Sequence, residues 1–308
     1  DQVQSPVRRL WMHAALLMIV LFGLLLFIDN GHAVIPDEGV YLAQASNLVD
    51  GSWSSARPAP DVDPDGFFTA VTDGGVIGDR VVPYFRHALY PLIITPAFAL
   101  FGVAGALAMS VLGTWSAAVV AAFLARRIDG RYGPWALWIV GIGSPLFFDA
   151  FIVVGHSIVA ALAGLMLLGL ARALDDRRPA NLAYALPALA AAVALRSEAI
   201  LLVAATGAVI GLMALGVPRR RPTNWTGILI AAAVLGIGAV AYLADSRVAG
   251  WIIRGGSYST GVTQRLASED VDLVSGSWAS LLRPFHGSWV NAGFLVPLAA
   301  LGVIFAAA

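Results

Sequence analysis

Residues 10–28, LWMHAALLMIVLFGLLLFI, decide the class of fold to which this chain belongs. The run contains no acidic residue and no arginine, and it follows Arg8 and Arg9 directly. A helix needs about 20 predominantly apolar residues to cross the hydrocarbon core of a bilayer, and this run is long enough. It is longer than the apolar core of a signal peptide, so it predicts a retained first transmembrane helix.

The composition of the whole chain agrees with a membrane protein. Of the 308 residues, 59% are hydrophobic and 12% are charged, and a soluble domain carries roughly twice that charged fraction. The net charge is zero, which gives no reason to expect nucleic-acid binding. The lack of cysteine excludes disulfides and thiolate metal sites. All basic residues are arginine, and this usage favours a GC-rich genome such as that of an actinobacterium.

Further apolar runs predict an all-α polytopic membrane protein, a single module over residues 1–308 with about eight spans. After the first span they cover residues 104–125, 132–148, 157–173, 182–195, 199–216, 227–244 and 292–308. The last run reaches the end of the sequence without a polar cap, and we expect a longer protein of which this is the N-terminal part. The run 88–101 contains Pro91 and Pro96, which argue against a simple span and predict a re-entrant or interfacial pair of short helices.

Arginine placement predicts which ends of the spans share a side. Short cytoplasmic loops of membrane proteins hold the excess of positive charge. Arginines cluster in four short segments, at 8–9, 126–131, 172–178 and 219–221, and these fall on one side only if the run 88–101 does not cross. The N-terminus is then cytoplasmic in a bacterial plasma membrane. The first loop, 29–103, the later segment, 245–290, and the turns near 149–156 and 196 then lie outside.

Two adjacent carboxylates, Asp37 and Glu38, open the stretch IPDEGVYLAQASNLVD at residues 35–50. Pro36 and two acids favour a helix N-terminus, and the following apolar spacing predicts a helix that lies along the membrane surface. Successive residues on a helix point about 100° apart, so the two acids cannot share one role. One can face a reacting centre while the other bonds backbone or an arginine. The alternative is that both only cap the helix.

Three further clusters lie on the predicted outer face. Arg196 is a candidate for binding a lipid phosphate because its planar fork makes bidentate bonds, and the alternative is a surface pair with Glu198. Asp149 and His156 could bind an acceptor or relay a proton, or His156 could be an ordinary interfacial residue. Aromatic and basic residues that could hold sugar or phosphate, or form an aromatic belt, are Tyr84, Arg86, His87, Trp278, Arg283 and His286.

The sequence leaves several classes of function open. The histidines show no metal-ligand spacing, so we predict no metal site and no required cofactor, although a carboxylate-bound divalent cation is compatible with the residues. The chain contains no Gly-rich nucleotide loop and no GxSxG motif. A transporter or flippase for a lipid-linked sugar is one alternative, although its spans usually contain charged residues. A non-catalytic subunit of a cell-envelope assembly is another.

In order along the chain, these elements resemble the GT-C fold glycosyltransferases. The likeness rests on an Asp-Glu pair after the first span, PYFRHALYPLIITPAFALFG at residues 83–102, SPLFFDAF with GHS at 144–157, and AVALRSEAILL at 192–202. It is nearest to the lipid-A aminoarabinose transferases and protein O-mannosyltransferases, and it covers most of residues 10–215. The basic residue at the re-entry is followed by Ala88-Leu89, where the family often has Pro-Pro-Leu.

The resemblance implies a single inverting displacement at the outer face. A polyprenyl-phosphate sugar would be the donor, with its tail among the spans, and a glycan, lipid or protein hydroxyl would be the acceptor. Asp37 would be the general base and Glu38 its orienting partner. Arg196, then Arg86 and His87, would hold the donor phosphate. Asp149, His156, Tyr84, Trp278, Arg283 and His286 would contact the sugar or the acceptor.

Overall fold

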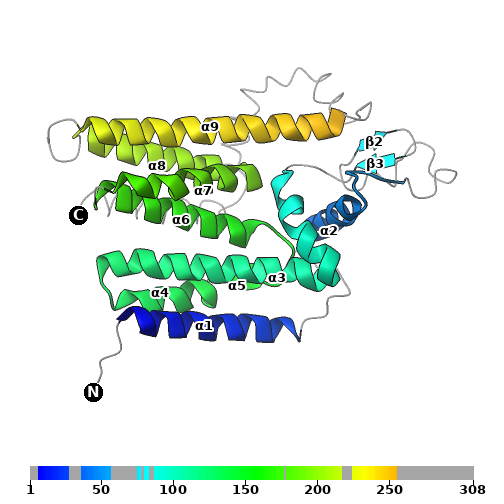
Figure 1. Cartoon of the computed structure of the whole chain (residues 1–308), viewed down its shortest axis with the longest axis horizontal. Coiled ribbons are helices and arrows are strands. Elements are labelled where there is room, and N and C mark those ends of the chain that lie inside the picture. The colour runs from blue at the N-terminus through cyan, green and yellow to red at the C-terminus, as the bar shows by residue number, and fades with distance from the viewer. Residues whose placement is uncertain are drawn as a thin grey trace, which may run out of the picture.

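The computed structural model of the chain is a row of helices with a small sheet beside one end (Figure 1). It describes residues 6–27, 36–56, 75–77, 80–82, 87–176, 178–216 and 224–254. In chain order the elements are α1 (Pro6–Leu25), α2 (Pro36–Val49), β1 (Ser55–Ala56), β2 (Gly75–Ile77), β3 (Arg80–Val82), α3 (Leu89–Ile128), α4 (Tyr132–Gly141), α5 (Leu146–Asp149), α6 (His156–Leu174), η2 (Pro179–Asn181), α7 (Leu182–Leu195), α8 (Ala199–Ala214) and α9 (Trp225–Arg254).

Within the described residues, four helices are long and apolar enough to cross a membrane, namely α1, α3, α6 and α9. The prediction of a mainly helical membrane protein is therefore confirmed. Helices α7 and α8 are apolar but shorter, with 14 and 16 residues. The span predicted at 292–308 lies outside the described residues.

The predicted span 132–148 is not one continuous helix. Helix α4 ends at Gly141, and a separate turn of helix, α5, begins at Leu146. Pro145 cannot donate a backbone hydrogen bond, and the Ser144 hydroxyl donates to the Val140 carbonyl at 2.7 Å. The backbone N–H of Leu146 donates to the same hydroxyl at 3.2 Å, so the Ser144 side chain links the end of α4 to the start of α5.

The run 88–101 is a single helical segment and not the predicted pair of short helices. Helix α3 continues through Pro96 and has non-helical backbone only at Gly102, with φ 61° and ψ −145°. Pro91 lies in the first turn, where backbone N–H groups have no helical partner, so its ring is tolerated there. Backbone angles like those of Gly102 are essentially confined to glycine. Gly102 therefore separates the segment 89–101 from the long part of α3.

Helix α9 is longer than the predicted span 227–244, because it runs ten residues past Ala244 to Arg254. Trp225 near its start and Trp251 near its end are both 73% exposed. Tryptophan gathers at the two interfaces of a bilayer. The 26-residue separation corresponds to about 39 Å along a helix, compared with about 30 Å for the hydrocarbon core.

A small antiparallel sheet departs from the all-α prediction. Its strand order is β1–β3–β2, and each strand has only two or three residues. The Arg80 guanidinium ties the sheet to the end of α2 by donating to the hydroxyls of Ser54 and Ser52, at 2.7 Å and 3.1 Å.

Most of the helix packing in the described residues is around two large apolar cores, and a small third cluster joins Ala88 to Ala249 and Ile252. The first joins α1, α2, α3 and α4 around residues such as Leu17, Tyr90 and Leu137. The second joins α6, α7, α8 and α9 around Leu189 and Val234. Helix α3 connects the two halves by packing against α6 as well as α4. Helices α1, α4, α7 and α9 run in one direction along the row, and α3, α6 and α8 run in the other (Figure 1).

Most of the arginines that the structure describes lie at one end of the row. Arg127 at the end of α3 donates to Asp175 at 3.1 Å and to Asp176 at 3.0 Å, just after α6. Exposed Trp135 and Trp225 lie on the first turns of α4 and α9, and exposed Trp11 lies on the second turn of α1, near this end. We call it the arginine end. Helix α2 and the small sheet lie at the opposite end (Figure 1).

Candidate functional site

The polar site begins at the N-terminus of α2, where Asp37 and Glu38 occupy the first turn. Both acids interact favourably with the positive end of the helix dipole. Asp37 is exposed, whereas Glu38 is only 3% exposed. The two adjacent acids therefore have different surroundings.

Glu38 attaches α2 to a distant loop. The backbone N–H of Val153 donates to Glu38 Oε1 at 2.9 Å, and Val153 is fully buried. A carboxylate that accepts a hydrogen bond from backbone N–H lowers the cost of its own burial. The bond fixes the start of α2 against the segment 150–155, which connects α5 to α6.

The second polar pair flanks that same segment. Asp149 is the last residue of α5 and His156 the first residue of α6. His156 Nδ1 lies 3.4 Å from Asp149 Oδ2, and the two side chains are 41% and 19% exposed. This distance is longer than a good hydrogen bond but within ion-pair range. The structure thus brings together the carboxylate and imidazole that the sequence analysis singled out, and leaves the imidazole accessible.

Tyr90 packs between α2 and the start of α6. Its ring meets the ring of Tyr41 edge to face, with centroids 4.6 Å apart. A Cβ placed on Gly155 would lie 3.4 Å from the Tyr90 ring, so the loop before His156 rests directly on this tyrosine. Tyr90 is fully buried. The first turn of α3 is therefore the support for both acidic segments.

His87, three residues before Tyr90, joins three parts of the chain. The backbone N–H of Ser197 donates to His87 Nε2 at 3.3 Å, and His87 Nδ1 lies 2.7 Å from Asp245 Oδ2 on α9. Because Nε2 accepts a hydrogen bond, the proton of the neutral ring is on Nδ1 and is donated to Asp245. Both ring nitrogens are occupied, so in this arrangement neither is available to a donor phosphate.

Arg196 lies in the turn between α7 and α8, beside Ser197. Its Nε and one terminal nitrogen donate to the two Glu198 oxygens, each at 3.2 Å. Of the two alternatives for Arg196, the surface pair with Glu198 is the one seen here. Burial raises the pKa of Glu198, but the bonds from Arg196 and from its own backbone outweigh burial, and the pKa is lowered overall.

These contacts place the described candidates at one end of the row, opposite the arginine end. They come from α2 (Asp37, Glu38), the α5–α6 loop (Asp149, His156), the start of α3 (His87) and the α7–α8 turn (Arg196). Tyr84, Arg86, Trp278, Arg283 and His286 lie outside the described residues.

Sequence reasoning missed Asp245. It was assigned to the beginning of an outer loop, whereas its side chain is 9% exposed and bonded to His87. One signal was available, because YLADSR interrupts an otherwise apolar run at residues 242–247. Among the described residues, no group of three His, Asp or Glu side chains lies close enough together to hold a metal ion.

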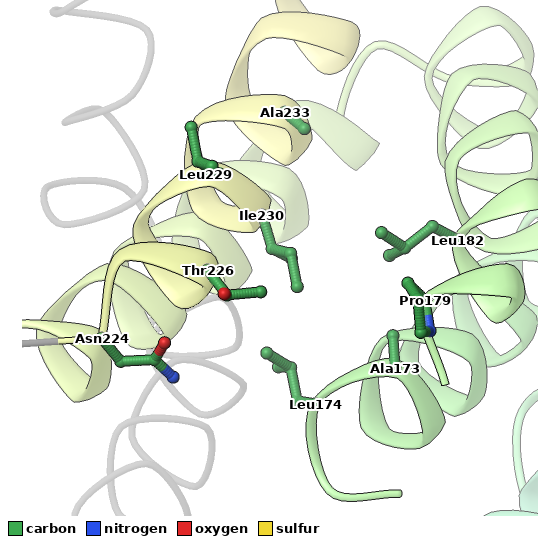
Figure 2. A pocket seen from close by; sticks show the side chains of 9 residues that line it. All are labelled: Ala173, Leu174, Pro179, Leu182, Asn224, Thr226, Leu229, Ile230 and Ala233. Carbon is green, nitrogen blue, oxygen red and sulfur yellow. The ribbon is translucent and has the colours of Figure 1, made fainter. Parts of the chain in front are cut away.

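Within the described residues, two largely apolar cavities bear on the position of the site, and the larger of these two is remote from it. It has a volume of about 720 Å³ and lies between α9 and the connection from α6 to α7, near the arginine end. Figure 2 shows Ile230 facing Leu174 and Leu182 across it. The smaller cavity, about 310 Å³, runs between α3 and α6 and is lined by Ile93 and Ile158 near the polar end. For a lipid that must reach the polar site, position favours the smaller cavity.

The described residues form a mainly helical protein with four helices that are long and apolar enough to cross a membrane, and with a polar cluster at one end of the bundle. Comparisons with protein-family models, with curated proteins and with solved structures found no match to this chain.

Proposed function

We propose that the protein is a membrane glycosyltransferase that moves a sugar from a polyprenyl-phosphate donor to an acceptor hydroxyl at the extracytoplasmic face. One observation carries the proposal. Asp37 is an exposed carboxylate at the end of a bundle of apolar helices, and its neighbour Glu38 is buried and bonded to the loop that bears Asp149 and His156. An exposed acid on a fixed support, beside a membrane, suits a general base that acts on a lipid-linked substrate.

The reaction is a single displacement with inversion at the sugar. The acceptor oxygen attacks the anomeric carbon, and the bond from that carbon to the phosphate oxygen breaks. The electron pair leaves with the polyprenyl phosphate, and Asp37 takes the proton of the acceptor hydroxyl. Asp149 and His156 hold the acceptor or the sugar through their exposed edges. The leaving phosphate departs as an anion and needs positive charge in place of an acid.

Arg196 supplies that charge. A guanidinium has five N–H donors, and the two bonds to Glu198 leave further N–H groups for a phosphate. Arg86 is a second candidate from the sequence. The apolar cavity between α3 and α6 gives the isoprenoid tail a place beside the site, because Ile93 follows Tyr90 by less than one helical turn.

Release of polyprenyl phosphate tests the proposal. Purified protein is incubated with a radiolabelled polyprenyl-phosphate sugar and a membrane extract that supplies acceptors. We expect polyprenyl phosphate to be released and label to enter the acceptor fraction. The same protein in liposomes is tested for movement of the intact donor between leaflets. Donor movement without release would contradict a transferase and support a flippase.

A further inference from the structure

We infer that Asp245 and His87 form a positioning pair that holds the turn at Arg196–Glu198, and thereby fixes the Arg196 guanidinium for its ligand. The inference rests on the proposed function in one respect, namely that this ligand is the donor phosphate. Neither residue is given a role in the displacement itself.

The pair joins segments that are far apart in sequence. Asp245 lies 158 residues from His87, and Ser197 lies 110 residues from it. The side chains of His87 and Asp245 are only 7% and 9% exposed. Burying a carboxylate is costly unless it is paired, and here the imidazole Nδ1–H pairs with it at 2.7 Å. The other end of the imidazole then accepts the backbone N–H that directly follows Arg196.

The Asp245 carboxylate selects the tautomer of His87 that can accept a hydrogen bond from Ser197. With Asp245 present, the ring proton is held on Nδ1 and Nε2 remains an acceptor for Ser197 N–H. Without an acceptor at position 245, the Nδ1–H is left unpaired in a buried place. The alternative tautomer would then direct its Nε2–H at the Ser197 N–H. Two donors would face each other, and no hydrogen bond could form between them. The turn would lose its attachment to α3.

Two substitutions at position 245 have different expected effects. Asp245→Ala removes the acceptor. Asp245→Asn keeps an oxygen that can accept from Nδ1–H and changes only the charge. Ser246→Ala is the matched control, because the neighbouring Ser246 is exposed and its hydroxyl bonds only one turn back, to the Tyr242 carbonyl at 2.9 Å.

The first measurement is hydrogen–deuterium exchange in the backbone of residues 196–201, in detergent and without substrate. Asp245→Ala should speed exchange there by about tenfold, as expected for the loss of one buried hydrogen bond. Asp245→Asn should recover most of the protection, and Ser246→Ala should match the unmodified protein. If Asp245→Ala cannot be purified, Asp245→Leu fills the same space without an acceptor and should give the same loss.

The second measurement is the donor dependence of sugar transfer. Asp245→Ala should lower kcat/KM for the donor by about tenfold and leave the KM for the acceptor little changed, because Arg196 is displaced but the base is not. Unchanged exchange in Asp245→Ala, or equal effects of Asp245→Ala and Asp245→Asn, would overturn the positioning role. Altered exchange with an unchanged kcat/KM for the donor would overturn the link to Arg196. If the unmodified protein transfers no sugar, the proposed function fails, and exchange alone decides whether the pair holds the turn.

Discussion

Arg196 and Glu198 form a two-bond pair at a partly exposed turn, where the arginine side chain is 27% exposed and the glutamate 55%. Exposed pairs of this kind contribute about 0–1 kcal/mol to stability. The pair is therefore well suited to a binding role, because a phosphate can take over part of the guanidinium at little cost to the fold. A deeply buried arginine pair would not give up its bonds so readily.

The lowered pKa of Glu198 predicts a pH dependence. Its carboxyl binds a proton more weakly in the folded state than in the unfolded state, so its contribution to stability is present at neutral pH. That contribution is lost as the pH falls below the ordinary glutamate range, about 4.3, towards the folded-state pKa. Thermal unfolding in detergent should show Glu198→Gln less stable than the unmodified protein at pH 7. An equal deficit at pH 3 would contradict this.

The sequence could identify both acids of α2 but not their separate surroundings. The 100° between neighbours on a helix already required different directions for Asp37 and Glu38. Which acid is buried depends on Val153, 115 residues away, and local pattern carries no information about such a contact. The same is true of His87, whose aromatic surroundings indicated an interface and whose partners, Ser197 and Asp245, come from two other elements.

At the scale of elements, the contact between α3 and α6 sets the geometry of the Asp149–His156 pair. Gly113 allows α3 to approach the first turn of α6, where Ser157 donates to the Ser110 carbonyl at 3.0 Å. Small residues at helix interfaces allow this close approach in membranes. His156 precedes Ser157, so the distance between the two helices also determines where the imidazole lies.

Gly113→Ala tests that contact. The added Cβ would lie 2.5 Å from Ser157 Oγ and 2.8 Å from the backbone nitrogen of Ile158, which cannot move without shifting α6. We expect a loss of about 1–3 kcal/mol in stability, measured as a lower Tm in detergent. Gly236→Ala on α9 is the control, because nothing lies within 4 Å of its added Cβ. A loss in Gly236→Ala as large as that in Gly113→Ala would show that the close approach is not the cause.

Apolar runs identified the long helices because each must present a continuous apolar surface to lipid. Their interruptions were harder to predict. Pro96 indicated a break but is accommodated inside α3, whereas the backbone actually changes direction at Gly102. Glycine permits such a conformation without requiring it, so composition alone could not locate the bend.

At the scale of the whole molecule, the two ends of the bundle differ in charge and in chemistry. Most arginines of the described segments lie at the end where α1 begins and where α3, α4, α6 and α7 connect, whereas Arg80, Arg196 and Arg247 lie with the candidate base and its partners at the opposite end. The rule that positive charge stays in the cytoplasm then predicts a cytoplasmic arginine end, and this is the orientation that the proposed donor would require.

Cysteine labelling tests this orientation directly, because the chain has no cysteine of its own. Asp50→Cys, after α2, and Gly130→Cys, between α3 and α4, are both at exposed positions on opposite ends. A membrane-impermeant maleimide added to intact cells should label Asp50→Cys and leave Gly130→Cys unlabelled until the cells are opened. The reverse pattern would place the candidate site in the cytoplasm.

The most direct test of the central claim is the transfer rate of Asp37→Asn beside that of Asp50→Asn, in membranes that contain a labelled polyprenyl-phosphate sugar. Exposed Asp37 lies in the first turn of α2 and exposed Asp50 directly follows its last residue, so the two variants make the same chemical change at the two ends of one segment. A general base contributes about 10²–10⁴-fold to a rate, and Asp37→Asn should lose at least the lower figure while Asp50→Asn retains the unmodified rate. Transfer by Asp37→Asn at the unmodified rate, with equal amounts of protein, would contradict the account.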